Sequence, residues 1–219
     1  MDSNHKISNS TLILLAGGHS SRMLVAGNHL HKGLLDYHGH PWIVEQIERF
    51  QQCGGKQTIV VVNHLCAPLF IPILTPLADV EWIINATPDL GGPFSSLKLA
   101  LKQCPTPPLI ILPIDTPLLS KEHLLPLLES GPPVVITIPF LPESKKSGHP
   151  IIIHHTAFIE KILATPLASS DARLDHQIKK LSPQEILRIA VPDPQILINL
   201  NTIEAWNQYC SHFSPPIVL

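Results

Sequence analysis

The chain has 219 residues, a length typical of one large domain or two small ones, and 44% of the residues are hydrophobic. Only 15% are charged and the formal net charge is −2, which argues against a broad basic face for nucleic acid but leaves room for a small anion site. The 23 prolines are about twice the usual share.

The predicted elements begin after a polar segment, residues 1–10, which we expect to be a flexible tail. Residues 11–16 form a short apolar run that leads directly into Gly17 and Gly18, a pattern typical of a buried strand that feeds a glycine turn. Residues 41–53 have apolar side chains at helical spacing, with proline at the start and two glycines after the end.

The rest of the chain alternates in the same way. Further strands are predicted at residues 58–63, 80–84, 109–112, 134–138, 150–154, 186–191 and 196–200, and helices at 94–103, 120–129, 157–164, 171–181 and 202–210. Residues 139–147 are expected to form a loop or lid, and residues 211–219 a C-terminal tail.

These strands are apolar on both faces and alternate with helices. The pattern predicts an α/β fold, a single-domain Rossmann-like three-layer sandwich over residues 11–210, with a mostly parallel sheet covered by helices on both sides. Four scattered cysteines without a C-x-x-C pair indicate reduced thiols in a cytoplasmic protein. No apolar run approaches 18 residues, so we expect no membrane span.

Three features carry chemistry. Gly17 and Gly18 let backbone N–H groups approach phosphates at the end of a strand, where Ser20 and Arg22 can add donors, although a plain turn with an exposed arginine fits as well. Lys32 follows shortly afterwards in a chain with few cations. Asp115 ends a buried strand, where a carboxylate can cap a helix, form a turn or bind Mg²⁺.

Together and in this order, the three features resemble the MobA-like nucleotidyltransferases that act in molybdenum cofactor synthesis. The matching segments are LAGGHSSRM at 15–23, KGLL at 32–35, Gly92-Pro93, DTP at 115–117 and NLNT at 199–202. The resemblance covers residues 11 to 209 and implies the nucleotide-diphospho-sugar transferase type of fold. It implies transfer of a nucleoside monophosphate from a nucleoside triphosphate, most simply GTP, to the phosphate of molybdopterin, with Mg²⁺ and release of pyrophosphate.

The resemblance also implies roles for individual residues. Arg22, Lys32 and Asp115 would be catalytic, with Asp115 also holding the metal ion. The nucleotide would contact Leu15, Ala16, Gly17, Gly18, Ser20, Lys32, Asn63, Asn85 and Gly92. The second substrate would contact His149, Asn199 and Asn201. A molybdoenzyme or a cofactor chaperone is an expected protein partner, and nucleic acid and membrane are not.

The chain departs from the family pattern between Met23 and Lys32, a segment about four residues longer than usual. Leu24 stands where the family has glycine, His31 where it has aspartate before the lysine, and Ile203 where it has proline. A catalytically degenerate relative is therefore one alternative, and a non-catalytic escort that binds the finished cofactor is another.

The choice of nucleotide is divided between two sets of matches. Residues 32–35, 92–93 and 199–201 look like the guanylyl enzymes, which we favour. Residues 94–98, 147–150 and 192–194 look like the cytidylyltransferases of the same cofactor, so CTP is the alternative substrate. Other phosphate acceptors also remain open.

Two further patterns have alternative interpretations. Five histidines lie within 22 residues, at His19, His29, His31, His38 and His40, which fits solvated loop residues or a site for zinc, nickel or copper. The apolar, proline-rich segment 65–77 fits buried packing or a docking surface.

Overall fold

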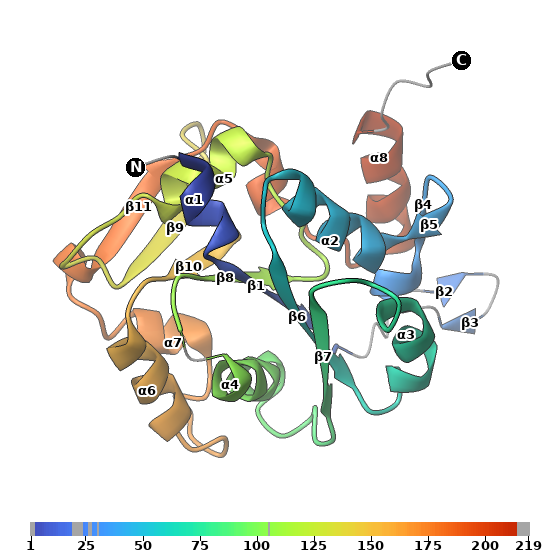
Figure 1. The fold of residues 1–219 in the computed structure, drawn as a ribbon, viewed down its shortest axis with the longest axis horizontal. Helices are drawn as coiled ribbons and strands as arrows, with labels where there is room; N and C mark the ends of the chain where they lie inside the picture. Colours follow the sequence, from blue (N-terminus) through green and yellow to red (C-terminus); the bar gives the residue numbers. More distant parts are fainter. Residues whose placement is uncertain (1–2, 19–23, 26–27, 30, 105, 214–219) are drawn as a thin grey trace.

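A seven-stranded sheet forms the centre of the molecule (Figure 1). The computed structural model describes residues 3–18, 24–25, 28–29, 31–104 and 106–213. The strands lie in the order β11-β9-β10-β8-β1-β6-β7, and β10 alone runs antiparallel to its neighbours. Their bounds are β1 Thr11–Ala16, β6 Gln57–Asn63, β7 Val80–Asn85, β8 Leu109–Pro113, β9 Ile136–Phe140, β10 Ile151–Ile153 and β11 Ile186–Ala190.

The central strands are apolar on both faces because each face is covered by helices. In β1, Leu12 and Leu14 pack into one cluster of buried side chains, while Ile13 between them packs into the other. This alternation follows from the two-residue period of a strand. The mostly parallel, three-layer α/β fold predicted from the sequence is therefore confirmed.

The helices divide between the two faces of the sheet, with α1, α2 and α5 above it and α4, α6 and α7 below it in Figure 1. The first face carries α1 (Ser3–Ser8), α2 (Trp42–Gln52), α3 (Ala67–Leu74), α5 (Lys121–Leu128) and α8 (Ile203–Phe213). The second carries α4 (Pro93–Gln103), α6 (Thr156–Ala164) and α7 (Leu174–Ile178). Short elements link them: hairpins β2 Leu24–Val25 with β3 Asn28–His29 and β4 Asp36–Tyr37 with β5 His40–Pro41, and 3-10 turns η1 Lys32–Leu34, η2 Pro183–Glu185 and η3 Pro194–Leu197.

An aromatic cluster joins the last helix to α2. Trp42 packs edge-to-face on Trp206 at a centroid distance of 5.2 Å and on Tyr209 at 5.4 Å. Arg49 donates hydrogen bonds to the hydroxyls of Tyr209, at 2.9 Å, and Tyr37, at 3.2 Å. These contacts hold α8 against α2. They thereby bring residues 198–202, which precede α8, to the same side of the molecule as the turn at Gly17 and Gly18.

Two sequence expectations need correction, and a third segment whose structure was left open is now described. The flexible tail predicted for residues 1–10 is wrong for residues 3–8, which form α1, because Ile7 is fully buried against the core. The strand predicted at 196–200 is also wrong: Asp193 caps a 3-10 turn, accepting from the Gln195 N–H at 2.9 Å. Segment 65–77 is mostly α3, which buries Phe70 and Leu74 while Leu69 stays exposed.

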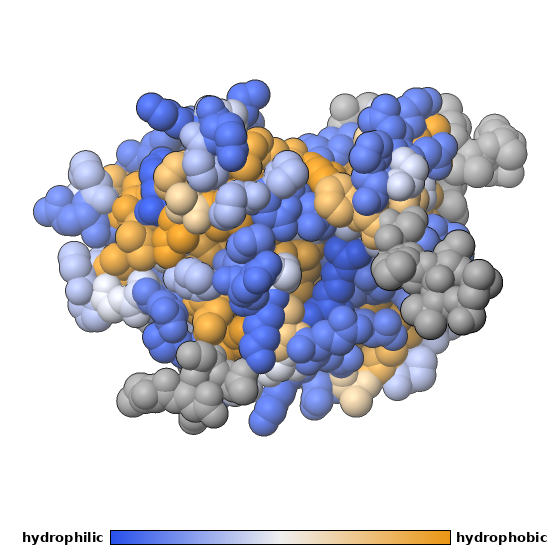
Figure 2. Space-filling view, turned by 90° about the horizontal axis from the view of Figure 1, so that it is seen from above, coloured by the Kyte–Doolittle hydropathy of each residue, from blue (hydrophilic) through white to orange (hydrophobic). Residues whose placement is uncertain are grey.

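The surface is mixed in character. Seen from above in Figure 2, hydrophilic side chains project over much of the face and hydrophobic surface is visible between them. Within the described residues, the helices are too short or too polar for any of them to cross a membrane.

Candidate active site

A cavity of about 620 Å³ opens at the carboxyl ends of β1 and β8, where an open α/β sheet binds its ligands. Its walls come from the loops after β1, β7 and β8, from the segment before β10, and from η3 with the residues that follow it. Its lining includes Leu15, Gly17, Gly18, His31, Lys32, Asp89, Gly92, Ser96, Asp115, Ser147, Gly148, His149 and Asn199. Predicted residues from separate parts of the sequence thus meet at one place.

The glycine turn after β1 lies very close to α4. A Cβ atom on Gly17 would stand 2.7 Å from the Ser96 Oγ, so only glycine fits there without movement. The buried Asn63 side chain donates to the Gly17 carbonyl at 3.1 Å and accepts from the Cys66 N–H at 2.8 Å. Asn63 therefore stabilises the turn by binding its backbone and does not line the cavity.

A second turn, η1, presents Lys32. His31 caps it: its Nδ1 accepts a hydrogen bond from the Gly33 N–H at 3.1 Å. The other ring nitrogen, Nε2, lies 3.0 Å from the Gly18 carbonyl oxygen. A neutral ring protonated at Nε2 makes both bonds. His31 is 5% exposed and packs edge-on against Phe70. One imidazole thus connects the glycine turn to the lysine turn.

Lys32 and Asp115, which both line the cavity, contact each other. The Lys32 Nζ donates to the Asp115 Oδ2 at 2.9 Å and also to the Oδ1 of Asn201, whose own amide contacts Asn199. The Leu200 N–H donates to the Asp115 carbonyl at 2.8 Å, which joins the C-terminal segment to the strand end. Lys32 is the one lysine or arginine among the described residues that line the cavity.

The loop that carries Asp115 is held by α2. Trp42 donates from its indole N–H to the Ile114 carbonyl at 2.7 Å. The side chain of Gln46 donates to the Thr116 carbonyl at 3.2 Å and accepts from the Leu118 N–H at 2.8 Å. The sequence pattern marked Trp42 only as core and did not single out Gln46. The available signal was a glutamine on the apolar face of a predicted helix, since such a side chain needs buried hydrogen-bond partners.

His149 enters from the opposite wall. Burial lowers the pKa of its imidazole, and the nearby Asp115 carboxylate offsets this only in part. Its Nδ1 is buried without a protein hydrogen-bond partner among the described residues. The preceding Gly148 lies so close to η3 that a Cβ there would stand 2.0 Å from the Ile196 carbonyl oxygen. A neutral imidazole is therefore held at the cavity wall.

Asn85 supports the site indirectly. Its side-chain N–H groups donate to the Ser95 Oγ at 2.8 Å and to the Ser96 Oγ at 3.0 Å, and its Oδ1 accepts from the Thr87 N–H at 3.0 Å. It thereby ties the end of β7 to the start of α4 without lining the cavity. Ala16 is likewise buried in the core, and Ser20 and Arg22 lie outside the described residues.

The fold and this cavity define a nucleotide-handling α/β protein, with a glycine turn and a lysine–aspartate pair at the ends of parallel strands. Residues 12–185 match the family model of the MobA-like NTP transferase domain. The chain therefore belongs to that family and is a nucleotidyltransferase.

Similar proteins agree with this assignment. The chain is 27% identical over 201 residues to a molybdenum cofactor guanylyltransferase of Polynucleobacter asymbioticus, covering 90% of this chain and 93% of that protein. A nucleotidyl transferase structure from Methanothermobacter has a TM-score of 0.73 at 19% identity, covering 93% and 97% of the two chains. Rv0371c of Mycobacterium tuberculosis, solved in complex with manganese, has a TM-score of 0.64 at 16% identity, covering 92% and 98%.

Proposed function

We propose that this chain transfers the guanylyl group of GTP to the phosphate of molybdopterin and releases pyrophosphate. The observation that carries the proposal is the Lys32–Asp115 pair beside the glycine turn, in a cavity formed by the strand ends. The name of the Polynucleobacter relative, which matches along nearly its whole length, supports the same reaction.

In this reaction an oxygen of the molybdopterin phosphate attacks the α-phosphorus of GTP, and the bond from that phosphorus to the bridging oxygen of pyrophosphate breaks. The backbone of Gly17 and Gly18 would receive the phosphates, since both glycines line the cavity and carry no side chain that would cover their N–H groups. Lys32 would neutralise charge on the triphosphate and the leaving pyrophosphate, and Arg22 would assist it. Catalysis of this kind depends mainly on positioning and electrostatic stabilisation.

The residues fit a divalent metal ion. Two carboxylates, Asp89 and Asp115, line the cavity beside the amide of Asn199, and Mg²⁺ prefers such hard oxygen donors together with substrate phosphates. Asp115 would hold the ion, and its Oδ2 accepts a hydrogen bond from Lys32 in this structure. The ion supplies positive charge to the phosphate oxygens. We propose Mg²⁺, and a manganese complex of a protein with this fold is consistent with a divalent ion at such a site.

The second substrate would lie towards the C-terminal wall. His149, Asn199 and Asn201 come from the segment between the 139–147 loop and β10 and from the segment before α8. Asn201 already shares Lys32 with Asp115, so these amides lie within reach of the phosphate that attacks. A neutral His149 would donate or accept one hydrogen bond there without adding charge.

Pyrophosphate release tests the proposal. The full chain is incubated with Mg²⁺ and each of the four nucleoside triphosphates, with and without molybdopterin. Of the four nucleotides, we expect only GTP to release pyrophosphate, and only when molybdopterin is present. Release from CTP and not from GTP would favour the cytidylyltransferase alternative. Nucleotide binding without any release would favour the two non-catalytic alternatives, the degenerate relative and the escort.

A further inference from the structure

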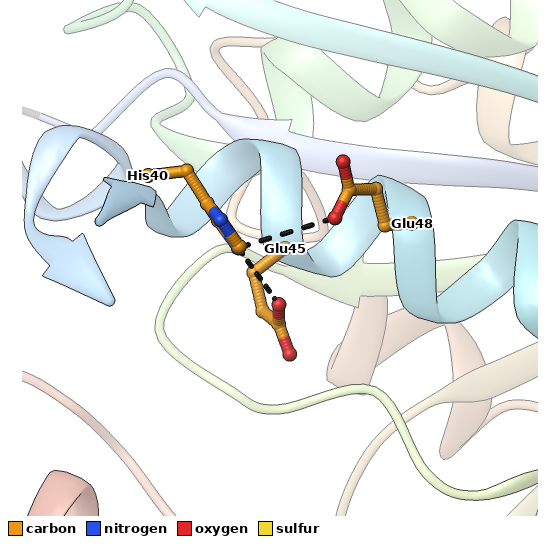
Figure 3. Close-up of side chains that lie close together, drawn as sticks. All are labelled: His40, Glu45 and Glu48. Carbon is orange, nitrogen blue, oxygen red and sulfur yellow. Dashed lines mark hydrogen bonds and ion pairs between the residues drawn. The ribbon is translucent and has the colours of Figure 1, made fainter. Parts of the chain in front are cut away.

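A second group of metal-ligating side chains lies outside the substrate cavity. His40 at the end of hairpin β4–β5 faces Glu45 and Glu48 on the first turns of α2 (Figure 3). One ligand atom from each residue can be chosen so that all three lie within 4.8 Å of one another. We propose that these three residues form a Zn²⁺ site that joins the hairpin to α2.

The distances suit a zinc ion. The His40 Nε2 lies 3.0 Å from the Glu45 Oε2 and 3.9 Å from the Glu48 Oε2. Ligands at about 2.1 Å from a tetrahedral zinc ion are separated by about 3.4 Å from one another, between these two values. The third separation, between the two carboxylates, is at most 4.8 Å. Side-chain rotations would bring all three atoms to zinc, and water would complete the coordination.

The other carboxylate oxygen of Glu45, Oε1, is bound by Arg49. Arg49 donates from Nε to the Glu45 Oε1 at 2.6 Å, which leaves Oε2 directed at His40. A ligand carboxylate oriented by an outer hydrogen-bond partner is the usual arrangement at metal sites.

The donor set selects the class of ion. One imidazole nitrogen with two carboxylate oxygens suits zinc, whereas Mg²⁺ prefers oxygen ligands alone. Glu45 and Glu48 are three residues apart on one helix, so they present their carboxylates on the same face. Together with Arg49 they leave one uncompensated negative charge when His40 is neutral, which favours a bound cation.

The site has a structural consequence for the substrate cavity. Hairpin β4–β5 follows directly on the turn that presents Lys32. The backbone N–H of Trp42, at the start of α2, donates to the Leu35 carbonyl at 2.9 Å. A zinc ion bound to His40 and Glu48 would fasten the hairpin to the helix whose Trp42 and Gln46 hold the Asp115 loop.

Zinc binding to the untagged, chelator-treated full chain tests this inference, measured by competition with a chromophoric chelator at pH 7.5 in the presence of millimolar Mg²⁺. We expect one zinc equivalent, with affinity reduced about 10-fold or more in His40→Gln and in Glu48→Gln. His38→Asn is the matched control, because His38 lies in the same hairpin with φ 53°, a conformation asparagine accepts. Its affinity should equal that of the unchanged chain.

Thermal melting provides a second readout. Zinc should raise the Tm of the unchanged chain and of His38→Asn, and should leave the Tm of Glu48→Gln unmoved. A cooperative melting transition of Glu48→Gln without metal checks that this variant is folded. Equal zinc affinity in all four proteins would place the ion elsewhere and overturn the inference. A group that acts only as an ion-pair network would bind no zinc equivalent at all, and that result would overturn it too. Asp115→Asn should bind zinc normally, since that residue belongs to the other site.

Discussion

Two cavities of nearly equal size lie at opposite ends of the same sheet, about 620 Å³ at the carboxyl ends of β1 and β8 and about 670 Å³ at their amino ends. The first is lined by two glycines of the β1 turn, a lysine and two aspartates. The second is lined by Pro107, Pro108 and Pro132, with Ser130, His154 and Lys6 around them.

The difference lies in the chemical groups that each end presents. At the carboxyl ends, Gly17 and Gly18 line the cavity without side chains, and Lys32 with Asp115 supplies paired charge. At the amino ends, prolines offer no N–H groups, and the charge of Lys6 is shared with Glu129 at 3.8 Å. Cavity volume therefore does not distinguish the two ends of the sheet, whereas strand direction and available donors favour the carboxyl ends, where we propose the active site.

The largest effect is expected from Asp115. Asp115→Ala removes the carboxylate that bonds to Lys32 and that we propose as the metal ligand, and pyrophosphate release should fall by about 10²- to 10³-fold. The matched control at the other cavity is Ser130→Ala, because the Ser130 Oγ is buried without a hydrogen-bond partner in the described structure. Its rate should be unchanged. Near-normal turnover in Asp115→Ala would remove Asp115 from the mechanism.

The main features of the first cavity could be predicted from the sequence because they directly follow buried strands. Gly17 and Asp115 stand at the ends of β1 and β8, and parallel strands bring their carboxyl ends to one edge. The orientation of Asn63 and Asn85 could not be predicted. A buried asparagine after a strand can face a ligand or the backbone, and only tertiary contacts show that both bind the backbone or α4 here.

The errors in the predicted elements have local causes. In α3, Pro68 at the first turn and Pro72 inside the helix mask the helical pattern, because proline normally ends helices. At η3 the run of apolar residues favours a strand, but the Asp193 side chain closes a turn and Pro194 begins it. Ile7 is too weak a signal in a polar segment for α1 to be predicted, since one buried residue sets no period.

A smaller effect is expected where the glycine turn meets α4. Gly17→Ala would place a Cβ 2.7 Å from the Ser96 Oγ, a close contact of the kind that costs roughly 1–3 kcal/mol. We expect kcat/KM for the nucleotide to fall about 10-fold. Ser96→Ala removes the colliding oxygen, so the double variant should recover part of the loss relative to Gly17→Ala. Additive losses would instead indicate that the two positions act independently.

His31 should have a smaller effect because it acts on backbone groups rather than on substrate. His31→Ala leaves the Gly33 N–H without its cap and the Gly18 carbonyl without this partner, and loss of a cap costs about 1 kcal/mol. We expect KM for the nucleotide to rise about fivefold. His31→Asn can still accept from Gly33 but is too short to reach Gly18, so its KM should lie between those of the unchanged chain and His31→Ala. A KM in His31→Asn equal to that of His31→Ala would show that the bond to Gly18 carries the effect.

The smallest effect on activity is expected at the second cavity, where His154 affects stability alone. Burial, and then the neighbouring His155, lower the pKa of His154 from 6.5 to about 4, and its Nε2 lies 2.8 Å from the Thr137 Oγ1. Between these two pKa values the unfolded chain binds a proton that the folded chain does not. This stability is therefore complete above pH 6.5 and is lost as the pH falls towards 4.

Urea unfolding at pH 7.5, 5.5 and 4.5 measures this loss. Because the imidazole is partly screened by solvent, we expect His154 to account for about 1–2 kcal/mol of the decrease in the free energy of unfolding. In His154→Gln, the free energy of unfolding should decrease by that much less between pH 7.5 and 4.5. Pyrophosphate release at pH 7.5 should stay unchanged. The pKa of His149 is also lowered by burial, but that group is present in both proteins, so its contribution cancels in the difference between them. Equal slopes would mean that His154 titrates alike in the folded and unfolded chain. A changed rate would mean that the amino ends of the strands take part in the reaction. That result would contradict the proposal that only the carboxyl ends carry the chemistry.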